Sequence, residues 1–476
     1  MNSSSSKFWF RLLFRHSGLA IALAYLLYMI FNNDVAVDIG DGILHYGYSE
    51  DSWEHHEHFL SHWAKPPFTL LSSPFAQVSY TVYLLFNVII FFFTSLAAFA
   101  VFRKLKSASG YFFFFPLILL AVPDYTYCVL GGMTEPLFGM LLAVMLWLAV
   151  SEKWTWFAVV ASFSLFSRSE GMLVVCLSFL MLIYNKAWKA IPFLTAGFIV
   201  YGIAGISVFG TFWWYFKNDP YTATGFYGSG PWNFYLVNYA SYAGHIMRYL
   251  IPVACLGWFI SFKRKDGQEK GIVLFAVSLF LLIIAIHSYL WFHGFKGSAG
   301  LTRLGTLGLV PFVIALLIGC NRFTKELHLL PLAVIFIFFS WYTAKKISLL
   351  PYPKQANANE QLIIQAAQFV KDNYSKRRVK YYHPMIGLTI GGKIINDPLV
   401  NVWSFNADTL ALNKLGEGEI VIRDMMFGDG EAGLPMDFIN SRKEMKVVKV
   451  FKAPAESHSL STGKNEVIVY EIVRNQ

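Results

Sequence analysis

Two carboxylates and one lysine lie close together in the sequence, within residues 33–79. Asp38 and Asp41 belong to DIGDGILHYG, which follows the first apolar segment, and Lys65 precedes two prolines in HFLSHWAKPPF. A carboxylate can act as a general base, and an ammonium group can bind and stabilise an anion. The stretch therefore contains the residue types that acid–base chemistry on an anionic substrate requires.

The elements that must position these residues are apolar. Of the 476 residues, 56% are hydrophobic and 14% are charged, and the mean hydropathy is +0.48. A soluble chain of this length needs far more polar surface, so we expect membrane lipids to cover much of it. The net charge of +10 does not indicate a nucleic-acid partner, because no basic patch interleaved with aromatic residues occurs in a soluble segment. Contact of cytoplasmic loops with anionic lipid explains the charge better.

A membrane-spanning helix needs about 20 mostly apolar residues, and about eleven segments approach this length. They lie near 17–32, 80–102, 111–123, 133–150, 154–168, 171–184, 191–212, 247–262, 271–291, 303–320 and 327–345. These spans predict an all-α, multi-pass domain over residues 1–345 in the cell (cytoplasmic or inner) membrane. The short pair 154–168 and 171–184 could instead form a re-entrant hairpin, which leaves the sidedness of later loops unchanged.

Basic residues are distributed unevenly between alternate loops. The crowded loops contain Lys7, Arg11, Arg15, Arg103, Lys104, Lys106, Lys153, Lys186, Lys189, Lys263, Arg264, Lys265, Lys270, Arg322 and Lys325. The opposite loops contain only Lys65, Arg168, Lys217, Arg248, Lys296 and Arg303. By the positive-inside rule the N-terminus is cytoplasmic and the sparse set faces outward. A charge placed against this insertion bias is a candidate for a functional site.

Residues 346–476 predict a separate domain. The composition changes at PYP (351–353), and residues 356–373 then have the periodicity of an amphipathic helix. Strand-like runs follow at 379–383, 419–423, 446–451 and 466–473. A helix followed by short strands predicts a small α/β domain, and an odd number of spans makes it extracytoplasmic.

The first outer loop, 33–79, is predicted to contain a short surface helix over EDSWEHHEHFLSHW (50–63). Pro66 and Pro67 would end this helix and begin the next one, since proline is tolerated in a first helical turn. Lys65 would then lie at a helix junction beside the bilayer surface.

The histidines of this loop permit a second interpretation. On one helix His55, His58 and His62 would share a face, which is a spacing that suits a metal ion. The zinc-binding H-E-x-x-H pattern is absent, because Leu60 occupies the second ligand position after His56. Surface histidines beside the membrane are therefore the preferred interpretation, and we assign no metal ligands.

Three motifs occur in order in the membrane part of the sequence. The first is the acidic motif followed by Lys-Pro-Pro in the first outer loop, the second is GGMTEPLFGMLLAVMLWL (131–148), and the third is SRSEGMLVV, around 168–174. Together they resemble the GT-C superfamily of polytopic glycosyltransferases, and most closely its protein O-mannosyltransferase and lipid A aminoarabinose transferase branch. The second motif is similar to the "tEplf" helix of that branch, and the third to its "RpEGll" segment. The resemblance covers about residues 10–345. The family commonly has Asp-Glu where this chain has Asp41-Gly42, so the acidic pair is incomplete.

The resemblance implies a glycosyltransferase that acts on the outer (periplasmic or extracytoplasmic) face. Its donor would be a sugar on a polyprenyl phosphate, and its acceptor a lipid, a glycan or a protein. Asp41 or Asp38 would take the proton of the acceptor, and cationic side chains would stabilise the departing phosphate. The substrate-binding candidates are Lys65, His45, Asp124, Glu135, Arg168, Glu170 and Arg303. No nucleotide-binding motif occurs, so no nucleotide cofactor is expected, whereas a divalent cation is an open alternative.

Two other classes of protein are alternatives. A transporter of a polar or lipid-linked solute would place charges along a path through the membrane, but the candidates here lie mostly at helix ends and in loops. A membrane anchor that only presents the C-terminal domain would show no outward cluster of charges. Structural roles also compete at single positions: Asp38 or Asp41 as a helix cap, Lys65 or Arg303 as an interface anchor, and Arg168 as the partner of Glu170 alone.

Overall fold

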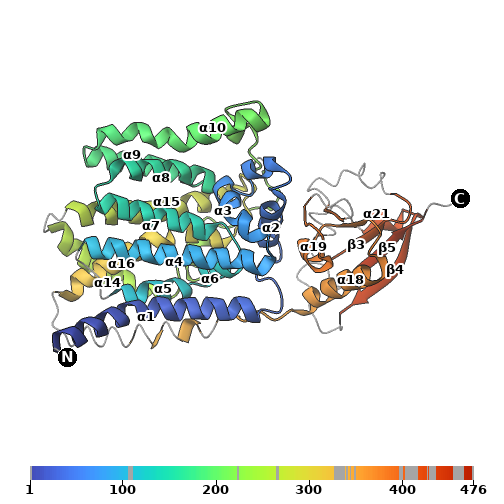
Figure 1. Cartoon of the computed structure of the whole chain (residues 1–476), viewed down its shortest axis with the longest axis horizontal. Helices are drawn as coiled ribbons and strands as arrows, with labels where there is room; N and C mark the ends of the chain where they lie inside the picture. The colour runs from blue at the N-terminus through green and yellow to red at the C-terminus, as the bar shows by residue number, and fades with distance from the viewer. Residues whose placement is uncertain are drawn as a thin grey trace.

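The structure is a computed structural model that describes most of the chain. The described residues are 3–105, 111–221, 224–263, 267–325, 338, 341–342, 345–347, 350–395, 400–402, 416–425, 427, 436–453 and 466–473. They form a large helical part and, at the C-terminus, a smaller part built on a β-sheet (Figure 1).

The helical part begins with α1 (Ser3–Asn32) and ends, among the described residues, with α16 (Leu309–Lys325). The helices between them are α2 (Asp41–Asp51), α3 (Pro66–Ala76), α4 (Tyr80–Lys104), α5 (Phe114–Leu120), α6 (Pro123–Leu130), α7 (Glu135–Val150), α8 (Trp154–Ser167), α9 (Gly171–Tyr184), α10 (Ala196–Phe209), α11 (Trp214–Lys217), α12 (Phe234–Val237), α13 (Tyr239–Tyr242), α14 (Met247–Lys263) and α15 (Gly267–His293). The 3₁₀ helices are η1 (His56–Leu60), η2 (Tyr111–Phe113), η3 (Trp188–Thr195) and η4 (Thr302–Gly308).

Four of the described helices are long and apolar enough to cross a membrane: α4, the continuous η3–α10, α15 and the continuous η4–α16. α6 and α7 would make a fifth span, although the chain bends by 108° between them. The predicted number of eleven spans is thus not confirmed. The expected span over 111–123 is interrupted, because η2 and the seven-residue α5 are followed by the proline that starts α6. The predicted span over 327–345 lies almost wholly outside the described residues.

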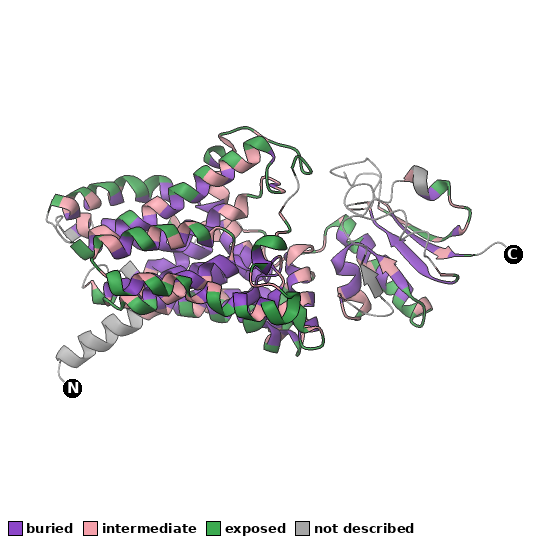
Figure 2. Ribbon diagram, turned by 90° about the horizontal axis from the view of Figure 1, so that it is seen from above, coloured by how far each residue is buried: buried purple, intermediate pink, exposed green. Residues whose placement is uncertain are grey.

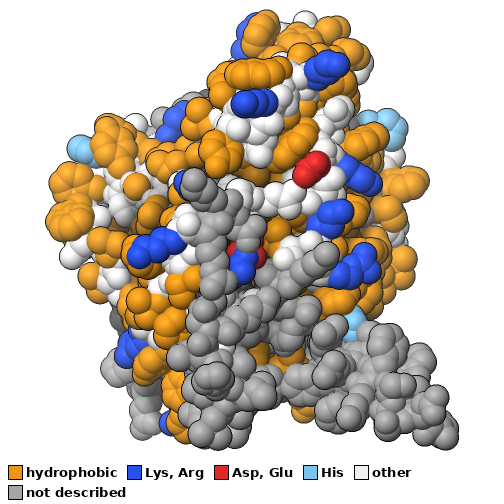
Figure 3. Space-filling view, turned by 90° about the vertical axis from the view of Figure 1, so that its left-hand side faces the viewer, with side chains coloured by type: hydrophobic (Ala, Val, Ile, Leu, Met, Phe, Trp, Pro, Cys, Tyr) orange, Lys and Arg blue, Asp and Glu red, His pale blue; other side chains and the backbone are white. Residues whose placement is uncertain are grey.

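Local sequence explains where α4, the first of these spans in the chain, begins and ends. Ser79 caps α4 by accepting a hydrogen bond from the Val82 N–H (3.2 Å), and Arg103 and Lys104 occupy its last turn, where cations favour the helix dipole. Figure 3 shows the end of the molecule that contains this last turn: Lys and Arg are spread among apolar side chains there, and Asp and Glu are rare among the coloured atoms. This distribution fits the predicted cytoplasmic side.

The helical core surrounds α16, whose apolar face packs against α7, α14 and α15. Buried residues accordingly line the inside of the helices, while exposed residues follow the outer helices (Figure 2). On α10 the exposed side chains are themselves apolar, including Ile199, Ile203 and Ile206. An apolar exposed helix face is stable against lipid, so this face is expected to contact the bilayer.

In the described residues of the C-terminal part, five strands form one sheet in the order β2-β1-β3-β5-β4. The bounds are β1 (Val379–Tyr381), β2 (Val400–Val402), β3 (Ile420–Arg423), β4 (Met445–Lys452) and β5 (Glu466–Ile472), with α18 (Ala358–Tyr374), α19 (Pro384–Ile390) and α21 (Met436–Asn440). β2, β1 and β3 are parallel, and β3, β5 and β4 are antiparallel. The predicted helix and four strands are confirmed, whereas β2 was not predicted. The predicted domain boundary at 345/346 lies in a sparsely described stretch and stays a prediction.

The first outer loop differs from its prediction in one respect. The helix does not span 50–63: α2 starts at Asp41 and ends at Asp51, and a 3₁₀ turn follows. The Ser52 hydroxyl bonds to the Ser49 carbonyl (2.9 Å), a local bond that competes with continued helix. The prediction that the prolines begin the next helix is confirmed, because Pro66 opens α3 and Lys65 precedes it with a φ of +70°. The prediction that they end a helix over 50–63 is wrong, because α2 already ends at Asp51.

Candidate active site

Most of the predicted site residues meet at the end of the helical part that faces the C-terminal part (Figure 1). Asp38 and Asp41 come from the start of the first outer loop, Glu135 from the first residue of α7, and Arg303 from η4. Residues 168–170 join α8 to α9 and add Arg168 and Glu170. All these groups lie at helix ends or in connections.

Asp38 is buried and has donors on both of its oxygens. Oδ1 accepts from the backbone N–H groups of Gly40 (2.9 Å) and Gly42 (2.8 Å). The Tyr127 hydroxyl donates to Oδ2, and Arg303 Nη1 lies 3.4 Å from the same oxygen. Burial and the neighbouring Asp41 charge raise the pKa of Asp38 from its usual range, in spite of these donors. The Asp38 carboxylate therefore stabilises the conformation of the loop through its hydrogen bonds.

Asp41 has a different environment. Its side chain is 41% exposed, and the guanidinium of Arg303 contacts Oδ2. Burial is the largest single influence and would raise the pKa of Asp41, but the charge and hydrogen bond of Arg303, together with the electrostatic influence of His45 and Arg168, lower the pKa from its ordinary value. Asp41 also opens α2, where the helix dipole favours a negative charge. The result is an ionised and accessible carboxylate.

The departure of this chain from the Asp-Glu pattern has a steric cause. A Cβ atom at Gly42 would lie 2.0 Å from the Gly131 carbonyl oxygen and 3.0 Å from Asp38 Cβ. The connection between α6 and α7 thus packs directly on the backbone of α2. A residue with a side chain would force these two segments apart.

Glu135 and two arginines extend the charged cluster from Asp41 into the helical part. Glu135 Oε1 lies 3.7 Å from Arg303 Nε and 3.5 Å from Arg168 Nη1. Arg168 Nε is 3.4 Å from Glu170 Oε2, and Glu170 Oε1 is 2.9 Å from His287 Nε2. Burial opposes ionisation of Glu170, but Arg168, the hydrogen bond and charge of His287, and a backbone hydrogen bond together hold its pKa well below the ordinary value. Each buried charge thereby has an opposite charge beside it.

Lys65 is buried, and its ammonium group donates to the His62 carbonyl (3.0 Å) and the Tyr221 hydroxyl (2.9 Å). Burial lowers its pKa to about 7, and the charge of Arg168 contributes to this shift. The electrostatic influence of Arg168, Glu170 and Glu135 places Lys65 beside the same cluster. The Lys65 side chain therefore does not extend into solvent, because its ammonium group is buried against these two acceptors.

The remaining two candidates lie at the edge of the cluster. His45 of α2 is buried and stacks on Trp63 with ring centroids 4.6 Å apart, and burial lowers its pKa to about 3. It is therefore neutral, and no group of the described residues forms a hydrogen bond with its buried Nδ1. Asp124, in the first turn of α6, interacts electrostatically with Arg303 and Glu135 but forms no ion pair among the described residues.

The loop histidines do not share a helix face. His58 Nε2 lies 3.0 Å from Asp51 Oδ2, and His62 is buried and stacks on Tyr215 at 3.8 Å between ring centroids. The interpretation as surface histidines is wrong for His62, because α11 covers it. Within the described ranges, no three or more His, Cys, Asp or Glu side chains are grouped so that they could hold a metal ion.

Sequence reasoning missed three groups that contact the cluster: Tyr127, Tyr221 and His287. Each lies in an aromatic-rich segment, where tyrosine and histidine are common and nothing distinguishes the one that faces a charge. Tyr127 offers the clearest signal in retrospect, since it is one turn beyond Asp124 on the α6 helix that precedes the TEPLF motif.

Comparison with known proteins identifies the fold. The sequence matches no family model and no curated protein. The apo crystal structure of ArnT from Cupriavidus metallidurans matches with a TM-score of 0.62 and 11% identity, and the match covers 98% of each chain. ArnT bound to undecaprenyl phosphate gives a TM-score of 0.58 at 10% identity, with 95% of this chain and 97% of that chain covered. The apo oligosaccharyltransferase from Archaeoglobus fulgidus gives 0.53 at 13% identity, with 93% and 74% covered.

ArnT, an aminoarabinose transferase, and the oligosaccharyltransferase are both GT-C proteins. The chain therefore shares the fold of these two proteins over nearly its whole length, and it is a multi-pass membrane protein. The predicted resemblance is confirmed at the level of fold. Since one fold can support several functions, the activity has to be argued from the residues of the site.

Proposed function

We propose that this protein transfers a sugar from a polyprenyl-phosphate donor to an acceptor at the outer face of the membrane. The observation that carries the proposal is the asymmetry between the two aspartates. Asp38 is buried among donors, while Asp41 is ionised, partly exposed and adjacent to a cluster that contains Arg303, Arg168 and Lys65. A base beside several cations is what displacement of a phosphate by a nucleophile needs.

In the proposed reaction Asp41 accepts the proton of the acceptor's nucleophilic group. The nucleophile forms a bond to the anomeric carbon, and the bond from that carbon to the phosphate oxygen breaks. The electron pair leaves on the polyprenyl phosphate, whose added charge is stabilised by Lys65 and Arg168. Asp38 supports this step only indirectly, by holding the Gly40 and Gly42 N–H groups on either side of Asp41.

The position of the charges supports a transferase over a transporter. Asp41 and Glu135 each begin a helix, Arg168 lies between α8 and α9, and Arg303 precedes α16. Charges at helix ends on one side of a membrane suit a surface-facing site, whereas a solute path needs polar groups along the spans. The outer position of this face and of the C-terminal domain belongs to the proposal and follows from the basic-residue bias.

The proposed function is tested by measuring sugar transfer directly. Purified protein in detergent or nanodiscs is incubated with a panel of radiolabelled polyprenyl-phosphate sugars and with membrane lipids, glycans and peptides as acceptors. We expect label to move from one donor to one class of acceptor, and the Asp41→Asn variant to lose this activity while still binding polyprenyl phosphate. Absence of transfer from every donor, by protein that binds none of them, would contradict the proposal.

A further inference from the structure

Lys354 of the C-terminal domain is bonded to the first outer loop along the stretch just after α1. Its backbone N–H donates to Asn33 Oδ1 (2.5 Å), and its carbonyl accepts from the Asp34 N–H (3.0 Å). Its ammonium group donates to the carbonyls of Ala36 (3.0 Å) and Val37 (3.2 Å). One residue thus contacts four of the five positions that lead from α1 to Asp38.

The ammonium group is itself held in place by the domain that provides it. Glu360 Oε1 lies 2.8 Å from Lys354 Nζ, and the Glu360 side chain is buried. Glu360 also forms a capping box with Asn357 at the start of α18, with both hydrogen bonds at 3.0 Å. The carboxylate is therefore fixed by helix formation, and Lys354 is oriented before it meets the loop.

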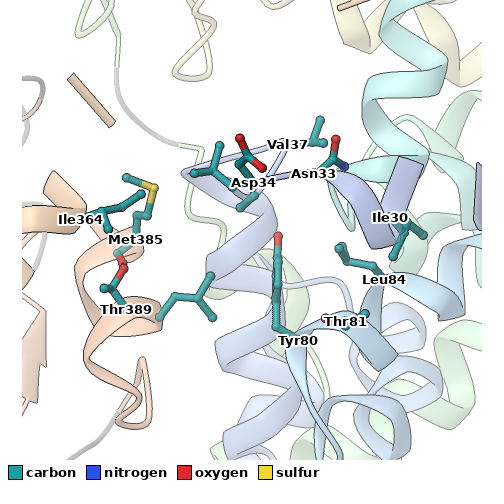
Figure 4. A pocket seen from close by; sticks show the side chains of 13 residues that line it. Ile30, Asn33, Asp34, Val37, Tyr80, Thr81, Leu84, Ile364, Met385 and Thr389 are labelled. Atoms are coloured by element: carbon teal, nitrogen blue, oxygen red, sulfur yellow. The ribbon is translucent and has the colours of Figure 1, made fainter. Parts of the chain in front are cut away.

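Packing restrains this stretch of the loop on one side, where Ala36 and Val37 are buried in the hydrophobic core, but less on the other side. A cavity of about 310 Å³ lies between the two domains, bordered by the loop at Asn33 and Val37, by Tyr80 and Leu84 of α4, and by Met385 of α19 (Figure 4). Figure 4 shows the α4 side chains and Met385 on opposite sides of this space, with the loop beside it. Since a cavity lining lacks contact atoms on one side, the hydrogen bonds of Lys354 add a restraint on the loop that packing beside the cavity does not supply.

The restraint extends to the proposed base through two bonds. Val37 precedes Asp38, and Asp38 Oδ1 accepts from the N–H groups of Gly40 and Gly42, which flank Asp41. We infer that Lys354 is a positioning residue for the catalytic loop: the C-terminal domain, through this one ammonium group, sets the place of Asp41 relative to Arg303. The kinetic part of this inference rests on the proposed function, but the structural part does not.

The experiment compares Lys354→Met with Lys393→Met in the full-length protein. Lys393 also links the C-terminal domain to the first outer loop, by an ion pair with the exposed Glu54, but it does not contact the carbonyls of Ala36 or Val37. Methionine keeps most of the lysine side-chain volume and removes the ammonium group. Lys354→Arg is the conservative variant, because a guanidinium can still donate to both carbonyls.

Hydrogen–deuterium exchange in peptides that cover residues 38–44 is the readout independent of activity. We expect Lys354→Met to speed exchange of these amides about 10-fold, with unchanged exchange in α4 and α7, and Lys354→Arg and Lys393→Met to behave as the parent. In transfer assays Lys354→Met should lower kcat about 10-fold or more with an unchanged KM for the donor, because misplacement of a base affects the chemical step.

Unchanged exchange in Lys354→Met overturns the inference whether or not the protein transfers sugar. Equal acceleration in Lys354→Met and Lys393→Met also overturns it, since loose domain contact alone would then explain the effect. If the parent protein transfers no sugar, the exchange comparison still decides the structural claim, so failure of the proposed function is distinguishable from failure of the positioning role. If Lys354→Met does not fold, Glu360→Gln is the second variant, because it removes the carboxylate charge beside the Lys354 ammonium group: faster exchange at residues 38–44 is expected, and parental exchange overturns the inference.

Discussion

Asp41 and Arg303 are 262 positions apart in the sequence, and their side chains are in direct contact. The same guanidinium lies 3.4 Å from Asp38 and 3.7 Å from Glu135, so one arginine forms ion pairs with three carboxylates. Of these three, Asp41 alone is substantially exposed. The contact keeps Asp41 ionised and links it to the buried charges of α7 and of the α8–α9 connection.

The first prediction separates the roles of the two aspartates. Asp41→Asn keeps the shape of the side chain but cannot accept a proton, so we expect transfer to fall by about 10²- to 10⁴-fold with donor binding preserved. Single-turnover rates and binding of labelled polyprenyl phosphate provide the measurement.

Asp38→Asn is the companion variant, and its effect should be on stability. An amide nitrogen at Oδ2 would face the Tyr127 hydroxyl and Arg303, both donors, which costs about 1–3 kcal/mol for each unmatched buried group. We expect a lower thermal midpoint together with a partial loss of activity. A parental melting curve combined with complete loss of transfer would instead assign the base to Asp38.

The second prediction concerns the geometry of Arg303. Arg303→Lys retains the positive charge but replaces three separate nitrogens by one, so Asp41, Asp38 and Glu135 cannot all be contacted. We expect kcat to fall about 10-fold or more, with a smaller change in donor affinity. Arg248→Lys is the matched control, because Arg248 is an exposed arginine that donates to the Tyr239 hydroxyl outside the cluster. Equal kinetics in the two variants would mean that Arg303 acts only as a charge.

The third prediction is a pH dependence of donor binding that originates in Lys65. Its pKa is lowered to about 7 by burial, with Arg168 as a further cause. The ammonium form therefore predominates at about pH 6 and the neutral amine at about pH 8.5, so affinity for a polyprenyl phosphate should fall as the pH rises.

Lys65→Arg tests this assignment, because a guanidinium stays charged throughout this range. Affinity in Lys65→Arg should change little between the two pH values, whereas the parent should lose about 10-fold, the usual value of a charge-assisted contact. A parent whose affinity rises with pH would contradict the sign, and parallel curves for parent and variant would assign the dependence to another group.

The fourth prediction is topological. A reporter fused after Gln476 should report an extracytoplasmic location, and a reporter inserted at Lys265 in the basic loop between α14 and α15 should report the cytoplasm. Alkaline phosphatase and green fluorescent protein fusions give opposite signals and control for expression. Cytoplasmic signals at both positions would mean an even number of spans before the C-terminal domain.

The sequence by itself was sufficient for features that depend on neighbours along the chain. The apolar segments predicted α4 and α15, the two prolines after Lys65 predicted the start of α3, and the periodicity of 356–373 predicted α18. Periodicity and helix-end preferences act within a few turns, so they can be read without the fold. The candidate charges could be selected for a related reason: few basic residues lie on the sparse side, and each is costly to place there.

Tertiary structure decided which of those candidate residues have a structural role and which are placed to act in the proposed reaction. No local pattern distinguishes Asp38 from Asp41, because the donors that occupy Asp38 include Tyr127 and Arg303, which come from other helices. Three further features depend in the same way on which surfaces meet after packing. They are the burial of His62, the break in the predicted span over 111–123, and the contact of Lys354 with the loop. Composition and local spacing fix which groups a chain has near a membrane surface. Long-range contacts fix which of them stay ionised and exposed, since desolvation and neighbouring charges exist only once the helices are packed.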